Sequence, residues 1–273
     1  MFIKAKPNDK LKIDEVPEEK PLAKRIKQEL NDEIALANYL TKFTPEESIY
    51  KNEIVFIENL ISNGELKKST QMLTNLANML PNSPRCVYLS ALVIDRISEI
   101  EKSNPKLKKA VGIYKKLLTL DKLDKNLLYI AGKRLINRLQ FLGKINDALK
   151  YNEYLVSKMP NNINLINDLG VNYLIGDRPK QAKAQFNKVL STFDSNNSFA
   201  LCHLGFIIKQ FENKINESID LFKACLLSKN KNVMDGRFFY HLGDALTRFN
   251  RTDEVSCSIF LRFWQVFFFQ FLI

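Results

Sequence analysis

Two histidines, His203 and His241, are the only imidazoles in the chain that could act as a general base or a metal ligand. Both lie in apolar segments of helical character, so we expect packed or face-lining side chains. The chain has no nucleophile elbow, phosphate-binding loop, zinc-protease helix or glycine-rich dinucleotide turn. Adjacent carboxylates such as Glu46 and Glu47 belong to charged segments and are expected on the surface. The sequence therefore predicts no catalytic site and no metal site.

The four cysteines, Cys86, Cys202, Cys225 and Cys257, have no CxxC spacing. That spacing is typical of zinc sites and of redox pairs, so neither is predicted. Four cysteines in 273 residues also do not make the dense disulfide framework of a small secreted domain. We expect them to be small apolar fillers between helices.

The formal charge of +11 comes from 41 Lys and Arg against 30 Asp and Glu. Such a balance favours anionic partners in general. The basic residues are nevertheless scattered among acids, as where Lys209 precedes Glu212, and the densest cluster covers only residues 106–109. This distribution is typical of solvated helix faces, and the chain has no ribonucleoprotein, zinc-finger or basic-zipper motif. We expect no nucleic-acid partner.

The helices that must position any site repeat along the chain. Ala148 and Ala182 lie 34 residues apart, and Leu-Gly pairs end at Gly170, Gly205 and Gly243. A helix–turn–helix period of about 34 residues is the tetratricopeptide signature. The sequence therefore predicts an all-α fold, a tetratricopeptide-type α-solenoid of about five or six antiparallel helix pairs.

Small residues in the repeat predict where its two helices cross. Gly170 and Ala182 lie where a larger side chain would hold the helices apart, and Tyr173 and Phe186 fill the space around them. Pro160 ends the preceding second helix. Similar patterns occupy residues 129–160 and 198–229, weaker ones occupy 50–81 and 84–120, and a further one begins at 236.

Stacked pairs of this kind present their first helices along a concave groove, which is the predicted functional site. Amide and basic side chains there suit the backbone and carboxylates of an extended peptide. The predicted groove residues are Lys133, Asn137, Gln140, Asn164, Asn167, Arg237, Asp244 and Arg248. The alternative interpretation is that they are solvated polar residues on the exposed face of a scaffold.

Four sequence blocks carry a more specific resemblance: PNSPR (81–85), RLINRLQFLG (134–143), NDLGVNYLIGD (167–177) and DGRFFYHLGDA (235–245). In order and spacing they resemble the luminal tetratricopeptide region of the aspartyl/asparaginyl β-hydroxylases, from about Pro81 to Glu254.

In that family the repeats precede an iron(II)- and 2-oxoglutarate-dependent dioxygenase domain, which hydroxylates Asp or Asn in EGF-like modules in the endoplasmic reticulum. The resemblance implies protein or peptide partners, including EGF-like domains, and a chain that is not itself an enzyme. It implies no cofactor in this chain, because iron and 2-oxoglutarate belong to the missing domain. It also implies the endoplasmic reticulum, whereas a complete chain without a signal would be cytoplasmic.

The expected organisation is a charged lead-in over 1–20, a repeat domain over 21–254 and an apolar tail over 255–273. The tail is barely long enough to cross a bilayer, and we interpret it as a truncated or mis-spliced end. Two alternatives stay open. The chain is either a fragment of a full-length hydroxylase or a stand-alone, tail-anchored repeat adaptor.

Overall fold

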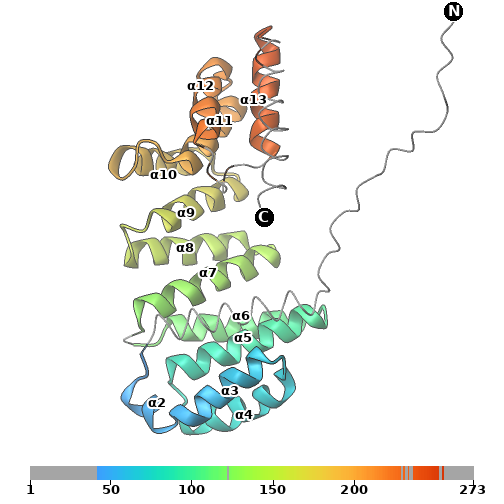
Figure 1. Ribbon diagram of the computed structural model, residues 1–273, viewed down its shortest axis with the longest axis vertical. Coiled ribbons are helices and arrows are strands. Elements are labelled where there is room, and N and C mark those ends of the chain that lie inside the picture. The colour runs from blue at the N-terminus through green and yellow to red at the C-terminus, as the bar shows by residue number, and fades with distance from the viewer. Residues whose placement is uncertain are drawn as a thin grey trace, which may run out of the picture. The chain divides into compact units, whose positions relative to one another are not determined.

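The structure is a computed structural model, and it describes residues 42–121, 123–228, 230, 233, 236–251 and 254. All regular elements among these residues are helices, as predicted. Their bounds are α2 Pro45–Ile49, α3 Lys51–Ser62, α4 Leu66–Met79, α5 Pro84–Ile100, α6 Asn104–Leu118, α7 Lys125–Phe141, α8 Ile145–Lys158, α9 Ile163–Ile175, α10 Pro179–Thr192, α11 Ser198–Phe211, α12 Ile215–Leu227 and α13 Gly236–Arg248 (Figure 1). The predicted lead-in, the predicted tail and Cys257 lie outside the described residues.

The chain divides into two compact units between Ile113 and Tyr114. Helices α2 to α5 belong to the first unit, helices α7 to α13 to the second, and the boundary falls within α6. The expected repeat domain, 21–254, spans both units.

Short polar residues and backbone turns set the ends of the helices in the second unit. Asn162 and Asn197 cap α9 and α11, each accepting a bond from the backbone N–H three residues on. Pro179 occupies the first turn of α10, where its missing N–H costs nothing. Gly143 and Asp177 follow α7 and α9 with positive φ angles of 69° and 54°, which turn the chain back sharply. Each first helix is therefore followed at once by an antiparallel second helix.

The predicted helix crossing is confirmed at α9 and α10. A Cβ placed on Gly170 would lie 2.6 Å from the ring of Phe186, so only glycine permits this approach. Ala182, Phe186 and Val189 on α10 are all completely buried. At the α11–α12 crossing, Gly205 makes a looser version of the same contact with Phe222, at 3.3 Å.

One buried position recurs four residues after the small residue of each second helix. It holds Leu73 on α4, Tyr114 on α6, Phe186 on α10 and Phe222 on α12, all at most 2% exposed. On α8 the same position holds Asn152, which is 0% exposed and whose Oδ1 and Nδ2 make no hydrogen bond to any described residue. A buried amide without partners destabilises the fold, so α8 carries a defect in an otherwise apolar series.

In the first unit a buried carboxylate holds α2 against α5. Glu47 is buried, accepting bonds from the Ser83 hydroxyl at 2.5 Å and from the Arg85 backbone N–H at 3.0 Å. The expectation that Glu47 lies on the surface is therefore wrong, because its carboxylate satisfies N–H and O–H donors at the start of α5. The Arg85 guanidinium in turn pairs with Glu58 at 3.0 Å, with both side chains buried. Among the described residues, no helix combines the length and apolarity needed to cross a bilayer.

Candidate peptide-binding face

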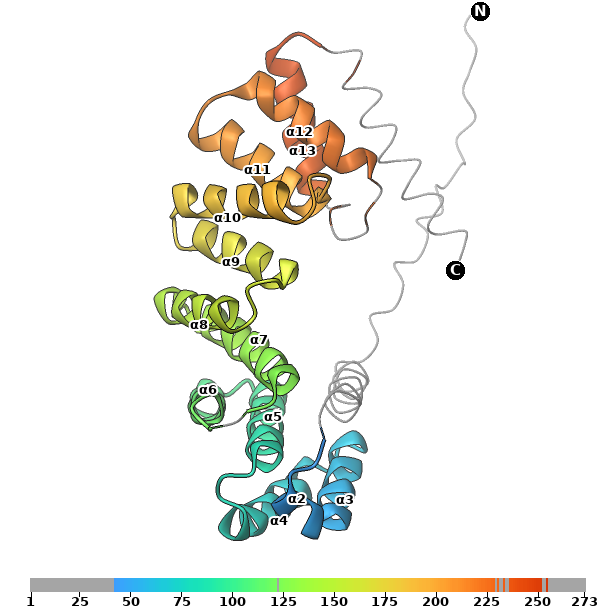
Figure 2. The ribbon, with the colours of Figure 1, turned by 90° about the vertical axis from the view of Figure 1, so that its left-hand side faces the viewer.

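Figure 2 shows α7, α9, α11 and α13, the first helices of the pairs in the second unit. Side chains spaced three or four residues apart share one side of a helix. On α7 this spacing aligns Tyr129, Lys133, Asn137 and Phe141, so the stripe changes from polar to apolar along the helix. The predicted groove residues on α7 and α9 are thus placed on helices that lie next to one another.

The Lys133 side chain already has a partner within the protein, because it bridges α7 and α9. Its Nζ lies 3.0 Å from an Asp168 carboxylate oxygen on α9, and 5.6 Å from the centre of the Tyr129 ring. Burial lowers the pKa of the Lys133 ammonium, but the Asp168 charge and hydrogen bond outweigh it, so the pKa is raised overall. Lys133 therefore links α7 to α9 through an ion pair.

Two further predicted residues serve the same purpose. Gln140 donates its side-chain amide to Asn172, again joining α7 to α9. Asn167 is buried and donates to the Oδ1 of Asn197 at 3.3 Å, which joins α9 to the cap of α11. These contacts hold the repeats in register and leave little of either side chain for a ligand.

On α11 and α13 a buried lysine organises the predicted residues. Lys209 has a side chain only 2% exposed, and its Nζ lies 2.6 Å from Asp244 and 2.9 Å from the carbonyl of His241. The hydrogen bond from Lys209, supported by Arg248, holds the pKa of the Asp244 carboxyl below its usual value. Burial and the Lys209 charge lower the pKa of His241. The expectation of a solvated Lys209 is wrong, because its partner is Asp244 one repeat away and not the nearby Glu212.

The sequence contained a signal for these pairs. Lys133 precedes Asp168 by 35 residues, and Lys209 precedes Asp244 by 35 residues. A lysine followed by an aspartate one repeat later therefore marks a bridge between successive first helices in this chain. The remaining predicted residues, Asn137, Asn164 and Arg237, are exposed and lie on three different helices, α7, α9 and α13.

The sequence interpretation missed an apolar series at the ends of the first helices. Phe141, Ile175 and Phe211 are the last residues of α7, α9 and α11, and they are 71%, 51% and 50% exposed. In the first unit, Ile100 ends α5 in the same way. Large apolar side chains that recur in exposed positions are typical of protein-binding surfaces. The 34-residue period could have revealed them, because each stands two residues before a positive-φ turn residue.

A cavity of about 710 Å³ opens at the opposite end of these helices. It lies where α8 leads into α9, and it includes the predicted groove residue Asn164. Its lining residues are Lys125, Lys158, Met159, Pro160, Asn161, Asn162, Ile163, Asn164 and Asn197. Basic and amide side chains thus dominate this end of the face, whereas apolar ones dominate the other end.

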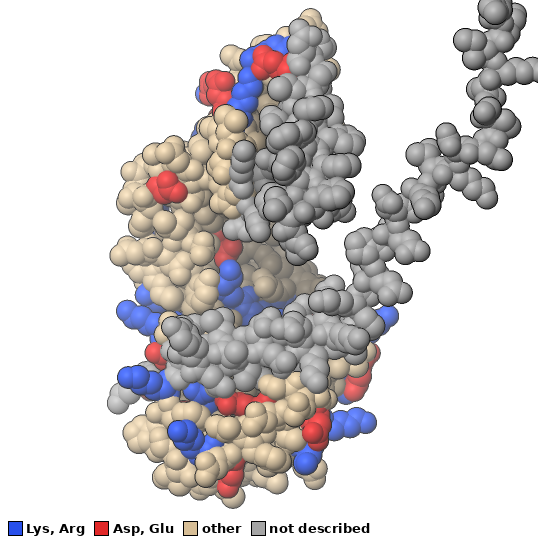
Figure 3. Space-filling view, in the orientation of Figure 1, with Lys and Arg blue, Asp and Glu red and all other residues tan. Residues whose placement is uncertain are grey.

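Charged side chains elsewhere are mixed in sign. On the face shown in Figure 3, lysines and arginines are interspersed with acidic and uncharged residues and do not merge into one basic stripe. Several of them form pairs between repeats, such as Lys115 with Asp147 at 2.8 Å and Lys183 with Glu212 at 2.6 Å. Much of the net positive charge is thus spread over the helices.

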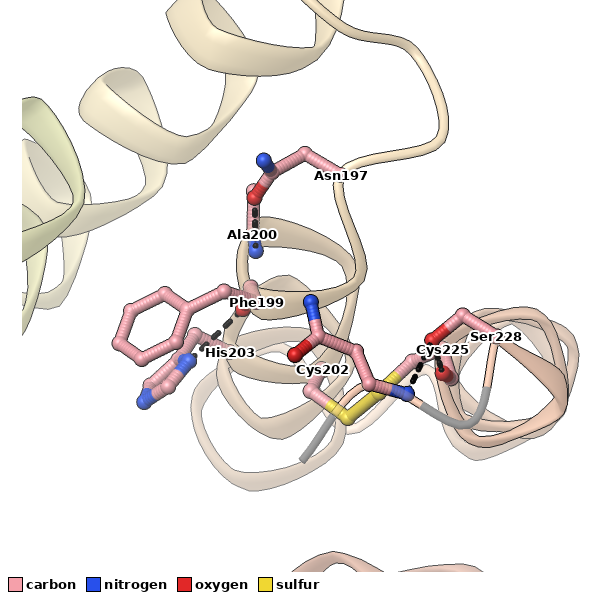
Figure 4. Close-up of a disulfide and its surroundings, with 8 residues drawn as sticks. Asn197, Phe199, Ala200, Cys202, His203, Cys225 and Ser228 are labelled. Carbon is pink, nitrogen blue, oxygen red and sulfur yellow. Dashed lines mark hydrogen bonds between the residues drawn. A yellow bond between two sulfur atoms is a disulfide. The ribbon is translucent and has the colours of Figure 1, made fainter. Parts of the chain in front are cut away.

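The expectation that all cysteines are unpaired fillers is wrong for two of them. Cys202 on α11 and Cys225 on α12 form a disulfide, with Cα atoms 5.4 Å apart (Figure 4). The reason is the helix crossing, which brings two residues 23 apart in sequence into direct contact without any CxxC spacing. Cys86 is free and buried, as expected of a filler.

Both histidines are packed, as predicted. His203 lies between the rings of Phe199 and Phe238, with centroids 4.2 and 5.1 Å away, and its Nδ1 donates to the Phe199 carbonyl (Figure 4). His241 contacts Phe206 and approaches Lys209. Non-haem iron needs imidazole and carboxylate ligands converging on an open position. These two imidazoles do not fit such a site, and the described residues hold no cluster of three or more possible ligands.

Comparisons with known proteins decide the relationship. The chain is 35% identical to the human aspartyl/asparaginyl beta-hydroxylase over 232 residues, and 35% identical to the mouse protein over 198 residues. These alignments cover 85% and 72% of the chain. The chain is a relative of the aspartyl/asparaginyl beta-hydroxylases. It spans only 29% and 26% of those two proteins, which is less than a third of their length.

The solved structures show the fold of this hydroxylase relative. A tetratricopeptide repeat protein from Parabacteroides merdae matches with a TM-score of 0.55 at 17% identity, covering 77% of each chain. The Pseudomonas aeruginosa protein pilF matches with a TM-score of 0.53 at 16% identity, covering 85% of this chain and 90% of its own. No family model matches the sequence. The predicted tetratricopeptide-type α-solenoid is confirmed.

Proposed function

We propose that this chain is a non-catalytic, protein-binding repeat region, equivalent to the part of an aspartyl/asparaginyl beta-hydroxylase that holds the substrate module. The observation that carries the proposal is the apolar series Phe141, Ile175 and Phe211, exposed at the ends of successive first helices. Aromatic and aliphatic anchors of this kind supply most of the free energy of protein association. The polar contacts between repeats, made by Lys133, Gln140 and Asn167, keep the helices in register and so keep these apolar side chains at fixed spacing.

The proposed partner is an EGF-like module, and the proposed compartment is the lumen of the endoplasmic reticulum. The kinship with the hydroxylases supports both proposals. The Cys202–Cys225 disulfide supports the compartment independently, because disulfides persist in oxidising compartments and are rare in the cytosol. Iron and 2-oxoglutarate are proposed to belong to the longer relatives' additional sequence, since the two imidazoles here are committed to packing.

Isothermal titration of the full chain with a folded EGF-like domain tests the proposal. The informative variant replaces Phe141, Ile175 and Phe211 with serine, and we expect it to weaken binding at least about tenfold. The matched control is Leu227→Ser, because Leu227 is an equally exposed last residue of a second helix, α12, in the same unit. If the triple variant binds as well as the control, the apolar series is not the binding surface.

The chain alone, without a dioxygenase domain, should also produce no succinate from 2-oxoglutarate when iron(II) and the EGF-like domain are present. Succinate formed in proportion to hydroxylated product would refute the non-catalytic part of the proposal. The two measurements are independent, because binding does not require turnover.

A further inference from the structure

The cavity at the start of α9 has a one-sided charge. Lys125 begins α7 and Lys158 ends α8, and both residues line the cavity. None of the described residues that line it is acidic. Neither lysine belongs to an ion pair among the described residues, unlike Lys133 or Lys209, although the Lys158 Nζ lies 5.5 Å from the Tyr154 ring. The cavity thus concentrates uncompensated positive charge.

The acids that neighbour the lining residues in sequence are already engaged. Asp124 caps α7, accepting from two backbone N–H groups at 2.8 and 3.3 Å. Asp194 accepts from the Asn196 backbone and from the side chain of Asn197. Both carboxylates keep their negative charge, but neither forms an ion pair with Lys125 or Lys158 among the described residues.

The amides of the lining add hydrogen-bond donors and a buried link to the core. Asn161 and Asn164 are exposed to the cavity, and Asn162 and Asn197 cap α9 and α11. Next to this lining, buried Asn167 donates its side-chain amide to the Asn197 Oδ1 at 3.3 Å, which links the cap of α11 to α9. Exposed amides such as Asn161 and Asn164 suit a peptide backbone, which both donates and accepts hydrogen bonds.

We propose that this cavity binds an acidic peptide segment of the protein partner, with an Asp or Glu carboxylate held between Lys125 and Lys158. The inference rests on the proposed function and names the partner's chemistry. We commit to a carboxylate because the proposed partner is a protein, whose Asp and Glu side chains supply that anion to lysine ammonium groups. A nucleic acid is disfavoured because the lining offers no aromatic ring for base stacking. Met159, Pro160 and Ile163 provide apolar contacts for the rest of the segment.

The test compares two fluorescein-labelled peptides by fluorescence anisotropy against the full chain. One peptide alternates glycine with Asp and Glu, and the other alternates glycine with Asn and Gln. The cavity variant is Lys125→Gln with Lys158→Gln. The control is Lys180→Gln with Lys188→Gln, two exposed lysines on α10 outside the cavity, so that both variants lose the same charge. All four substitutions lie on the surface, and circular dichroism melts confirm that folding is retained.

We expect the acidic peptide to bind at least about tenfold more tightly than its amide counterpart. The cavity variant should lose about tenfold in affinity for it, and the control less than about twofold. Equal losses in the two variants would mean diffuse attraction to a basic protein and would overturn the cavity site. Equal affinity for the two peptides would overturn it as well.

Titration with the EGF-like domain separates this inference from the proposed function. One outcome is that the serine triple variant loses domain binding while the two lysine double variants bind the domain equally well. That result overturns the cavity site and leaves the proposed function standing. If the unmodified chain does not bind the EGF-like domain, the proposed function is wrong. If a phosphorylated peptide binds more tightly than the acidic peptide, the choice of carboxylate is wrong.

Discussion

Replacing Asn152 with leucine should stabilise the second unit. The Asn152 side chain is completely buried on α8, and both of its polar atoms lack hydrogen-bond partners among the described residues. Leucine has the same number and branching of side-chain heavy atoms as asparagine, although it is larger, and it matches the apolar residues found at this position on the other second helices. The substitution removes an uncompensated polar group without changing the helix or the crossing.

The magnitude follows from two favourable contributions and one cost. Removing an unsatisfied buried amide gains about 1–3 kcal/mol, and burying the leucine side chain adds about 1.5–3 kcal/mol. Fitting the larger leucine into a site shaped for an amide costs about 1–3 kcal/mol. Central values of about 2 kcal/mol for each of the three terms leave a net stabilisation of about 2 kcal/mol, which corresponds to a rise of several degrees in melting temperature.

Urea unfolding followed by circular dichroism measures the change, with hydrogen exchange in α7 to α9 to place it, because repeat proteins can unfold in parts. Asn187→Leu on α10 is the control, since Asn187 is exposed and the same chemical change there should alter stability by less than about 0.5 kcal/mol. A loss of more than about 1 kcal/mol in Asn152→Leu would refute the reasoning, because the amide would then make compensating bonds or the site would not admit the larger leucine.

Three further predictions concern polar and covalent contacts. Cys202→Ser should lower the free energy of unfolding by about 3 kcal/mol, since the disulfide closes a loop of 23 residues, and reducing agent should then have no further effect in urea melts. Glu58→Ala should cost about 3–5 kcal/mol by leaving Arg85 buried without its carboxylate, and an undiminished melting temperature would contradict this. The lowered pKa of Asp244 stabilises the fold above the ordinary carboxyl pKa, near 4, and that stability is lost as the pH falls through the folded-state value. Asp244→Asn should therefore be less stable than the parent at pH 7, with a difference that shrinks in melts at about pH 3.

The fold could be predicted from the sequence because its signal is periodic. Small residues such as Gly170 and Ala182 must recur wherever two helices cross closely, so spacing alone reveals the repeat. The disulfide could not be predicted in this way, because Cys202 and Cys225 meet only through the geometry of the crossing. Nor could the burial of Glu47, whose adjacent acid and charged surroundings are typical of a surface segment.

The groove residues predicted from the sequence lie on first helices, and several of them have partners within the protein. Polar side chains midway along these helices face the next repeat as well as the groove. Lys133, Gln140 and Asn167 therefore find partners within the protein at 3.3 Å or less. A sequence pattern distinguishes polar from apolar residues, but it does not show whether a polar side chain is satisfied by a neighbouring repeat or by a ligand.

The geometry of stacked repeats supports the proposal that binding takes place at the helix ends. Midway along a first helix the adjacent helix is within reach of a side chain, so a long polar residue there bonds to it and stabilises the register. At the two ends of α7, the Phe141 side chain is 71% exposed and Lys125 lines the cavity. The unit therefore keeps a rigid polar middle, with apolar anchors at one edge and uncompensated lysines at the other. A partner that uses both edges must span α9, a helix of 13 residues, or about 20 Å, which sets the minimum length of an extended segment at about six residues.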